Sequence, residues 1–264
     1  MKKRTSLSTL SKKKILILIS TVILVLGLAY ACTNKQESNH STLHHSKLHH
    51  IPLIAGHDDE KGRESVVNLE PSEPAQEDVH HKDHFRSMTQ LFKHTKKGVD
   101  WKKEVRKVGS NVLVIAPHGG NIEAGTTELT KLIANDNHYD YYSFTVLRKK
   151  HAEDLHVTSA HYNDPTLLNM VKSKDFTVSI HGAKGNQPVI YLGGDLKENF
   201  VNENIKGKGV QLELTTALRK SLFVNEELLP NSRNKRSNWS PVMYRFSDAI
   251  DKAVQQVDDS GEDR

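Results

Sequence analysis

The residues His118, Glu123 and His181 have the side-chain types and the spacing of a metal site. His118 follows an apolar run and a proline, and Glu123 comes five positions later, after Gly119 and Gly120. The two glycines allow a tight turn that could bring the carboxylate back to the histidine. Two imidazoles and one carboxylate form the ligand set of many catalytic zinc sites, in which a fourth position stays open to water. These residues therefore predict one catalytic zinc ion.

Glu213 is the candidate catalytic residue. It alternates with apolar residues in the segment 211–214, so Glu213 and Gln211 face the same side of an expected strand. Zinc acidifies water and polarises a carbonyl, and a nearby carboxylate can act as general base and pass the proton to a leaving nitrogen. The combination predicts metal-assisted amide hydrolysis. Taken singly, each of these polar residues could instead end a strand or favour the N-terminus of a helix.

The candidate site residues follow short apolar runs that predict strands. The expected strands cover residues 112–115, 142–147, 176–180, 189–192 and 210–214. In an open α/β sheet, ligands bind beyond the carboxyl ends of the strands. His118 and His181 are expected just past two such ends, and Glu213 near a third.

Helical patterns separate these strands. They are expected over 127–135, from Asp164 and Pro165, from Asp195, and over 246–257. Thr126 or Thr127 is the expected N-cap of the first helix. The alternation of strands and helices predicts a single α/β domain with a mostly parallel or mixed sheet flanked by helices.

The first 31 residues predict a secretory leader. Basic residues within the first 14 positions precede an uncharged stretch at 15–31, which is the layout of a signal peptide. Residues 28–32 resemble a bacterial lipobox, and Cys32 is the only cysteine, which favours its lipidation. The same letters fit an ordinary signal-peptidase site, and the stretch is just long enough for a retained anchor. An extracytoplasmic, lipid-anchored protein is expected.

Residues 32–86 are expected to form a disordered tether, and residues 87–264 the ordered domain. The tether is polar and holds nine of the sixteen histidines. Such a segment cannot bury enough apolar surface to offset the entropy of ordering. Because His-rich tracts can bind metal, zinc capture is the alternative role of this segment.

Nucleic acid is not an expected partner. The formal net charge is +5, but six basic residues lie in the leader, which leaves −1 for the rest of the chain. A nucleic-acid-binding domain would keep a basic patch in its mature part.

Several segments resemble the poly-gamma-glutamate hydrolase family. APHGGNIEAGTTEL, LHVTSAHYNDP, SIHGAKG, YLGG and VQLELT occur in the order seen in that family, within residues 87–246. The resemblance implies a fold distantly similar to zinc carboxypeptidases. It also implies one zinc ion held by His118, Glu123 and His181, with Glu213 as the catalytic carboxylate. The implied substrate is the anionic polymer poly-γ-glutamate, cleaved at its γ-glutamyl amide bonds.

A polyanionic substrate should meet cations. Arg219 lies six residues after Glu213 and could clamp a substrate carboxylate with its planar guanidinium, so it is the predicted substrate-binding residue. Two other functions stay open: hydrolysis of γ-glutamyl bonds in peptidoglycan stem peptides, and zinc binding by a non-catalytic lipoprotein. A zinc carrier needs no general base, so Glu213 favours an enzyme.

Overall fold

The computed structural model describes residues 83–194 and 199–259, in which six strands form one mixed sheet of order β1-β3-β2-β4-β6-β5. The four central strands run parallel, and the edge strands β1 and β5 pair antiparallel with β3 and β6. This arrangement confirms the predicted α/β fold. The strands are β1 Trp101–Arg106, β2 Val112–Gly120, β3 Asp140–Val146, β4 Phe176–Ala183, β5 Ile190–Gly193 and β6 Gly209–Thr215.

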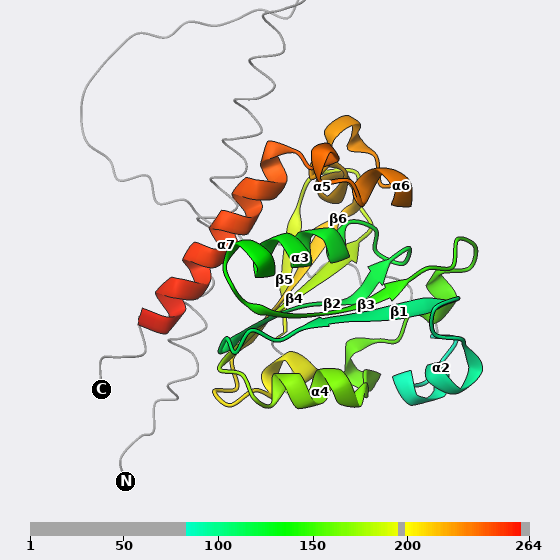
Figure 1. Ribbon diagram of the computed structural model, residues 1–264, viewed down its shortest axis with the longest axis horizontal. Coiled ribbons are helices and arrows are strands. Elements are labelled where there is room, and N and C mark those ends of the chain that lie inside the picture. The colour runs from blue at the N-terminus through cyan, green and yellow to red at the C-terminus, as the bar shows by residue number, and fades with distance from the viewer. Residues whose placement is uncertain (1–82, 195–198, 260–264) are drawn as a thin grey trace, which may run out of the picture. The chain divides into compact units, whose positions relative to one another are not determined.

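Helices cover both faces of the sheet (Figure 1). α3 (Thr126–Asp136) and α7 (Pro241–Asp259) pack on one face, and α2 (Met88–His94) and α4 (Pro165–Val171) pack on the other. The shorter helical elements are α5 Thr216–Ser221, α6 Pro230–Arg233, η1 Glu153–Leu155, η2 Ser159–His161, η3 Phe200–Asn202, η4 Val224–Glu226 and η5 Arg236–Asn238.

The central position of β2 in the sheet explains why its sequence is apolar without alternation. Val112 and Val114 pack into the core beneath α3 and α7, whereas Leu113 and Ile115 pack into the core beneath α2 and α4. Strands with helices on both faces are buried on both sides and therefore read as continuous hydrophobic runs. The layers hold the carboxyl ends of β2, β4 and β6 at one edge of the sheet.

Two expectations about where strands end are wrong. β2 does not end before His118 but continues to Gly120, with one extra residue against β3 between Ala116 and Gly119. Such a bulge re-aims side chains and is common next to active sites. His181 likewise lies within β4 rather than past its end.

The N-cap of α3 is Gly125 rather than either threonine. The Thr126 hydroxyl donates to the Glu123 carbonyl at 2.9 Å, and the Thr127 hydroxyl accepts from the Gly120 amide at 3.1 Å. Both hydroxyls therefore bind the turn that precedes the helix and are not available to cap it. The expected cap at Asp164 is confirmed, because its side chain accepts from the Thr166 amide.

A buried ion pair fixes the start of β3. The Asp140 carboxylate lies 2.6 Å from Lys174 Nζ and accepts from the Val108 amide at 2.7 Å. Burial alone would raise the pKa of Asp140, but Lys174 and the amides of Val108 and Ser110 outweigh burial and lower it. The pair joins β3 to the turn that precedes β4.

We expect Asp140→Asn to lower the free energy of unfolding at pH 7 by about 1.5–3 kcal/mol, the value of a hydrogen bond to a charged group. Because the folded pKa is depressed, the stabilisation is present above the unfolded pKa of about 3.9 and is lost as pH falls through the folded pKa. Urea unfolding at several pH values measures this. The two proteins should converge in acid, and a pH-independent gap would contradict the argument.

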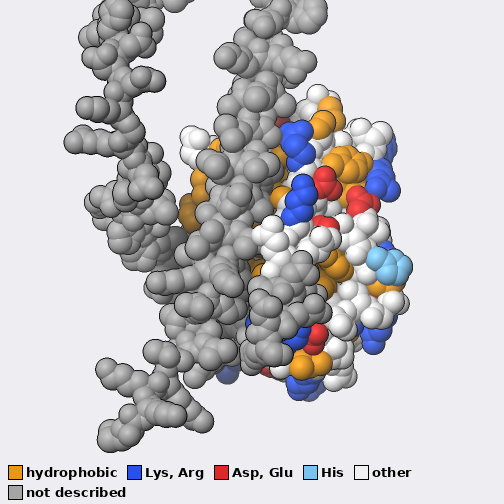
Figure 2. Space-filling model, turned by 90° about the vertical axis from the view of Figure 1, so that its left-hand side faces the viewer, with side chains coloured by type: hydrophobic (Ala, Val, Ile, Leu, Met, Phe, Trp, Pro, Cys, Tyr) orange, Lys and Arg blue, Asp and Glu red, His pale blue; other side chains and the backbone are white. Residues whose placement is uncertain are grey.

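The surface in Figure 2 carries charges of both signs, with basic and acidic side chains interspersed where described atoms are visible. The predicted leader, Cys32 and the tether up to residue 82 lie outside the described residues, and so does the helix start expected at Asp195. Across 83–194 and 199–259, no helix is both long and apolar enough to cross a membrane.

Candidate metal centre

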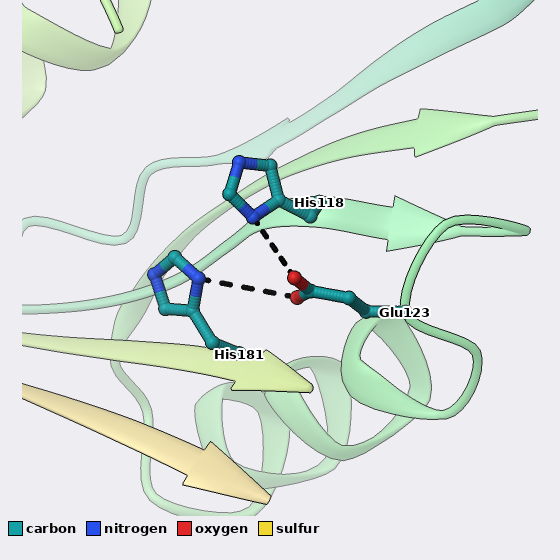
Figure 3. Close-up of side chains that lie close together, drawn as sticks. All are labelled: His118, Glu123 and His181. Carbon is teal, nitrogen blue, oxygen red and sulfur yellow. Dashed lines mark hydrogen bonds and ion pairs between the residues drawn. The ribbon is translucent and has the colours of Figure 1, made fainter. Parts of the chain in front are cut away.

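His118, Glu123 and His181 converge at the carboxyl edge of the sheet (Figure 3). Nδ1 of His118 lies 3.1 Å from Oε1 of Glu123, and Nδ1 of His181 lies 3.9 Å from Oε2 of the same carboxylate. All three residues are buried. The structure thus brings together the three ligands that the sequence predicted, from β2, from β4 and from the turn between β2 and α3.

The turn that returns Glu123 to His118 is held by the backbone. The Glu123 amide donates to the His118 carbonyl at 3.0 Å. Gly120 has a φ of +73°, and a Cβ there would lie 2.3 Å from the Val146 carbonyl oxygen. Only glycine fits such a position without strain. The two glycines therefore do what their sequence positions predicted.

Hydrogen bonds on the far side of each imidazole direct Nδ1 into the site. Nε2 of His118 donates to the Val157 carbonyl at 2.9 Å, and Nε2 of His181 lies 2.9 Å from the Ser179 hydroxyl. The carbonyl fixes both the tautomer and the orientation of the His118 ring, and the hydroxyl holds the orientation of the His181 ring. Both rings therefore present the nitrogen that faces Glu123.

Glu123 is positioned from two sides. Its Oε2 accepts from the Gly182 amide at 2.8 Å, in the strand that carries His181. A Cβ on Gly182 would lie 2.9 Å from the Glu123 Cβ and 2.8 Å from the Arg219 guanidinium carbon, so a larger residue would displace the ligand. The glycine that follows His181 thus makes room for Glu123.

The electrostatics of the trio suit a cation. Burial favours neutral forms, but the carboxylate of Glu123 outweighs burial and raises the pKa of His118. Burial also opposes ionisation of Glu123, and His118 nevertheless holds the pKa of Glu123 below its ordinary value. Burial together with the neighbouring histidines lowers the pKa of His181 to about 3. His181 is therefore neutral, as a metal ligand must be, and Glu123 is charged.

The three side chains fit a zinc ion. Tetrahedral zinc with nitrogen and oxygen ligands at about 2.0–2.2 Å keeps neighbouring ligand atoms about 3.3 Å apart. The candidate ligand atoms all lie within 4.8 Å of one another, so small side-chain shifts are enough. A second group with suitable atoms, His151, Glu153 and Asp154, is largely exposed, and the buried trio is the better site.

Glu213 lies beside the trio on the neighbouring strand. In the parallel register of β4 and β6, Glu213 stands opposite His181, and Oε1 of Glu213 is 3.9 Å from Nδ1 of His181. Gln211 faces the same side and donates to Oε1 of Glu213 at 2.6 Å. Burial first, and repulsion from Glu123 second, raise the pKa of Glu213 to about 7. A carboxylate with such a pKa can both take and return a proton near neutral pH.

Arg219 occupies a different place from the one expected of a substrate clamp. Its guanidinium donates to the carbonyls of Leu214, Ala124 and Ala183 at 3.1, 2.8 and 3.3 Å. These carbonyls belong to the segments that carry Glu213, Glu123 and His181. The buried arginine thus ties three site segments together, and its contact with substrate stays a prediction.

Sequence reasoning missed the residues around the histidines. His156 stacks on His118 with ring centroids 4.0 Å apart, and Tyr162 packs edge-on against it at 6.0 Å. The Tyr162 hydroxyl donates to the Pro117 carbonyl at 3.0 Å. His156, Val157 and Tyr162 all belong to the segment LHVTSAHYNDP, whose match to the family was the one available signal.

A pocket of about 410 Å³ lies at the same edge of the sheet. Its walls come from the loop between β4 and β5 and from α5, which directly follows β6. The polar lining includes one cation, Lys220, and one acid, Glu226. β4 and β6 also carry His181 and Glu213, so the pocket is a candidate extension of the metal centre.

The site consists of two buried histidines and a carboxylate, with a second carboxylate beside them at the carboxyl edge of a mixed sheet. These features define a candidate metallohydrolase of the α/β class. The family comparison agrees with that class. The chain matches the poly-gamma-glutamate hydrolase family over residues 85–198 and 194–249, and it belongs to this family. The membership confirms the resemblance seen in the sequence and places the chain among hydrolases.

Relatives occur in Bacillus subtilis strain 168. The SPbeta prophage-derived protein YoqZ is 31% identical over 180 residues, which cover 56% of this chain and 64% of YoqZ. The protein YndL is 28% identical over 202 residues, which cover 64% of this chain and 79% of YndL. The chain thus spans less than two thirds of the length of YoqZ and more than two thirds of the length of YndL.

Two solved structures share the fold. A bacteriophage poly-gamma-glutamate hydrolase superposes with a TM-score of 0.64 at 25% identity, over 67% of this chain and 99% of the phage protein. The zinc-free apo form of YndL superposes with a TM-score of 0.60 at 25% identity, over 66% and 98% of the two chains. Nearly the whole of each solved structure is matched, by about two thirds of this chain.

Proposed function

We propose that this protein is a hydrolase that cleaves the γ-glutamyl amide bonds of poly-γ-glutamate with one zinc ion held by His118, Glu123 and His181. The observation that carries the proposal is the buried trio with Glu213 directly opposite His181 on the next strand. The family membership supports the substrate, and the existence of a zinc-free form of YndL supports the metal.

The residues of this chain divide the reaction between them. The bound zinc supplies Lewis-acid polarisation and lowers the pKa of water. Glu213 takes a proton from the attacking water and delivers it to the leaving nitrogen, so the amide C–N bond breaks and the carboxylate is regenerated. With a cation held by the trio, Glu213 would be repelled less by Glu123, and its basic form would be favoured. Gln211 keeps the Glu213 carboxylate turned towards the site.

A panel of substrates tests this proposal. The full chain, loaded with zinc, is incubated separately with poly-γ-glutamate, with purified peptidoglycan and with α-linked polyglutamate, and the products are sized. Shortening of the γ-linked polymer alone is the expected result. Release of stem-peptide fragments without polymer shortening would favour the peptidoglycan alternative, and zinc binding without any hydrolysis would favour a zinc-binding lipoprotein.

The charges at the pocket predict opposite effects on substrate binding. Each unit of the polymer carries a carboxylate, which Lys220 attracts and Glu226 repels. We expect Lys220→Gln to raise KM for the polymer by about two- to fivefold and Glu226→Gln to lower it by a similar factor, because both charges are exposed and an exposed charge contact has an effect of this size. The kcat should stay constant in both. Steady-state kinetics measures this, and equal shifts in one direction would place the pocket outside the substrate path.

The proposal also includes the cellular location of the protein. We expect the protein to act outside the cytoplasm, attached to the membrane by a lipid on Cys32. The variant Cys32→Ser should either leave the membrane fraction or keep an uncut leader, which fractionation and gel mobility show. If Cys32 is lipidated, the wild type should also be labelled by a radioactive fatty acid, and Cys32→Ser should not be labelled. Unchanged fractionation, mobility and labelling would argue for another form of attachment or for none.

A further inference from the structure

We propose that Asp83 is a positioning residue of the metal centre, because it holds the backbone whose carbonyl orients His118. Oδ1 of Asp83 lies 2.7 Å from Nδ1 of His156, and Oδ2 accepts from the Thr158 amide at 2.7 Å. One carboxylate thus binds the residues on both sides of Val157. The inference rests on the proposed function, since it takes His118 to be a zinc ligand.

Val157 passes this constraint to the ligand. Its carbonyl accepts from Nε2 of His118 at 2.9 Å, and the position of that oxygen decides the direction of the ring and the nitrogen that carries the proton. Val157 is itself fully buried, with an exposed fraction of 0%. A shift of the segment 156–158 would therefore move the carbonyl relative to His118.

His156, in the same segment 156–158, makes a second contact with His118. Its ring lies over the His118 ring at 4.0 Å between centroids, with an angle of 37° between the planes. The bond from Asp83 to Nδ1 fixes how His156 is turned. His118 is thus held along its edge by the Val157 carbonyl and across its face by His156, and both contacts depend on Asp83.

The place of Asp83 in the chain gives the proposal a further consequence. The sequence indicated a tether through residue 86, yet Asp83 contacts the domain and Phe85 is buried in the core beneath α2 and α4. The N-cap contact of α2, in which the Ser87 hydroxyl accepts from the Gln90 amide, does not involve Asp83 or Phe85. A chain that began at Ser87 would lack both Asp83 and Phe85.

The test measures zinc affinity rather than hydrolysis. The full chain and Asp83→Ala are titrated with zinc against a chromogenic chelator, and the Co²⁺-substituted proteins are compared by visible spectroscopy. We expect Asp83→Ala to bind zinc about 10- to 100-fold more weakly, as is usual when the partner that orients a metal ligand is lost. Asp83→Asn keeps one acceptor oxygen for two donors and should lie between the two.

Asp100→Ala is the matched control. Asp100 is similarly shielded, with 18% of its side chain exposed against 15% for Asp83. It also binds one cationic side chain, Arg148 at 2.8 Å, and one backbone amide, Lys96 at 2.8 Å. Within the described part of the chain, the side-chain bonds of Asp100 go to Arg148 and Lys96 and not to the trio. Its loss should lower the melting temperature of the zinc-free protein without changing zinc affinity or the cobalt spectrum.

The outcomes separate this inference from the proposed function. If the wild type binds no zinc, the metal-dependent function fails. If the wild type binds zinc and Asp83→Ala binds it equally tightly with the same cobalt spectrum, only the role of Asp83 is overturned. If Asp83→Ala does not fold, the folded Asp83→Asn variant decides, and wild-type affinity in that variant overturns the proposal.

Discussion

Glu213→Gln should retain about one equivalent of zinc and lose about two to four orders of magnitude in kcat, the usual contribution of general acid–base catalysis. Glutamine has the shape of glutamate and can still accept the hydrogen bond that Gln211 donates. It cannot take a proton from water at neutral pH. The three ligands lie on other segments and are unchanged. Zinc content by atomic absorption, measured beside the rate of polymer shortening, checks both halves of this expectation.

The control for this variant is Glu203→Gln, which makes the same chemical change at an exposed position. Its zinc content and its rate should match those of the wild type. Loss of zinc from Glu213→Gln would identify Glu213 as a ligand, which its position 3.9 Å from His181 permits. Full activity in Glu213→Gln would assign the base to another residue.

The convergence of the candidate ligands could be predicted in part because residue types indicate their chemistry. A histidine, two glycines and a glutamate after an apolar run indicate a turn with a candidate ligand at each end, and the structure places Nδ1 of His118 3.1 Å from Oε1 of Glu123. The place of the third candidate ligand, His181, was predictable only through the fold class, because parallel strands share one carboxyl edge. The opposition of His181 and Glu213 follows from the register of β4 and β6, which the sequence does not specify.

The supports of the site could not be predicted because they come from distant parts of the chain. Val157 lies 39 residues from His118, and Asp83 lies 73 residues from His156. A backbone carbonyl has no signature in a sequence, since every residue has one. Arg219 shows the converse: its charge suggested a bond to substrate, whereas its neighbours offered backbone carbonyls.

The predicted strand boundaries were wrong for a related reason. A proline inside a buried strand is normally read as the end of that strand, because it cannot donate to the sheet. At Pro117 the extra residue of β2 absorbs this defect, and pairing with β3 resumes at Gly119. The edge strand β1 was missed because most of its side chains are partly exposed and polar. Sequence patterns detect the buried strands well and the edges poorly.

His118→Ala and His181→Ala should lose both bound zinc and activity. Each substitution leaves two protein ligands, too few for a stable zinc site. Removing a ring from the trio also leaves the charge of Glu123 with less compensation, since His118 is its ion-pair partner at 3.1 Å. The activity expected to remain is that of the zinc-free protein, which makes this the largest effect among the variants considered.

The stability of the protein gives an independent measure of the same loss. A ligand that binds only the folded state adds about 2.7 kcal/mol at a free concentration of one hundred times its Kd. Wild-type protein should therefore melt at a higher temperature when zinc is added, whereas both alanine variants should not respond. The exposed histidine His161 provides the control, because His161→Ala leaves the trio intact. A variant of His181 that keeps its zinc, its thermal response and its activity would show that β2, β4 and the turn after β2 do not build the metal site described above.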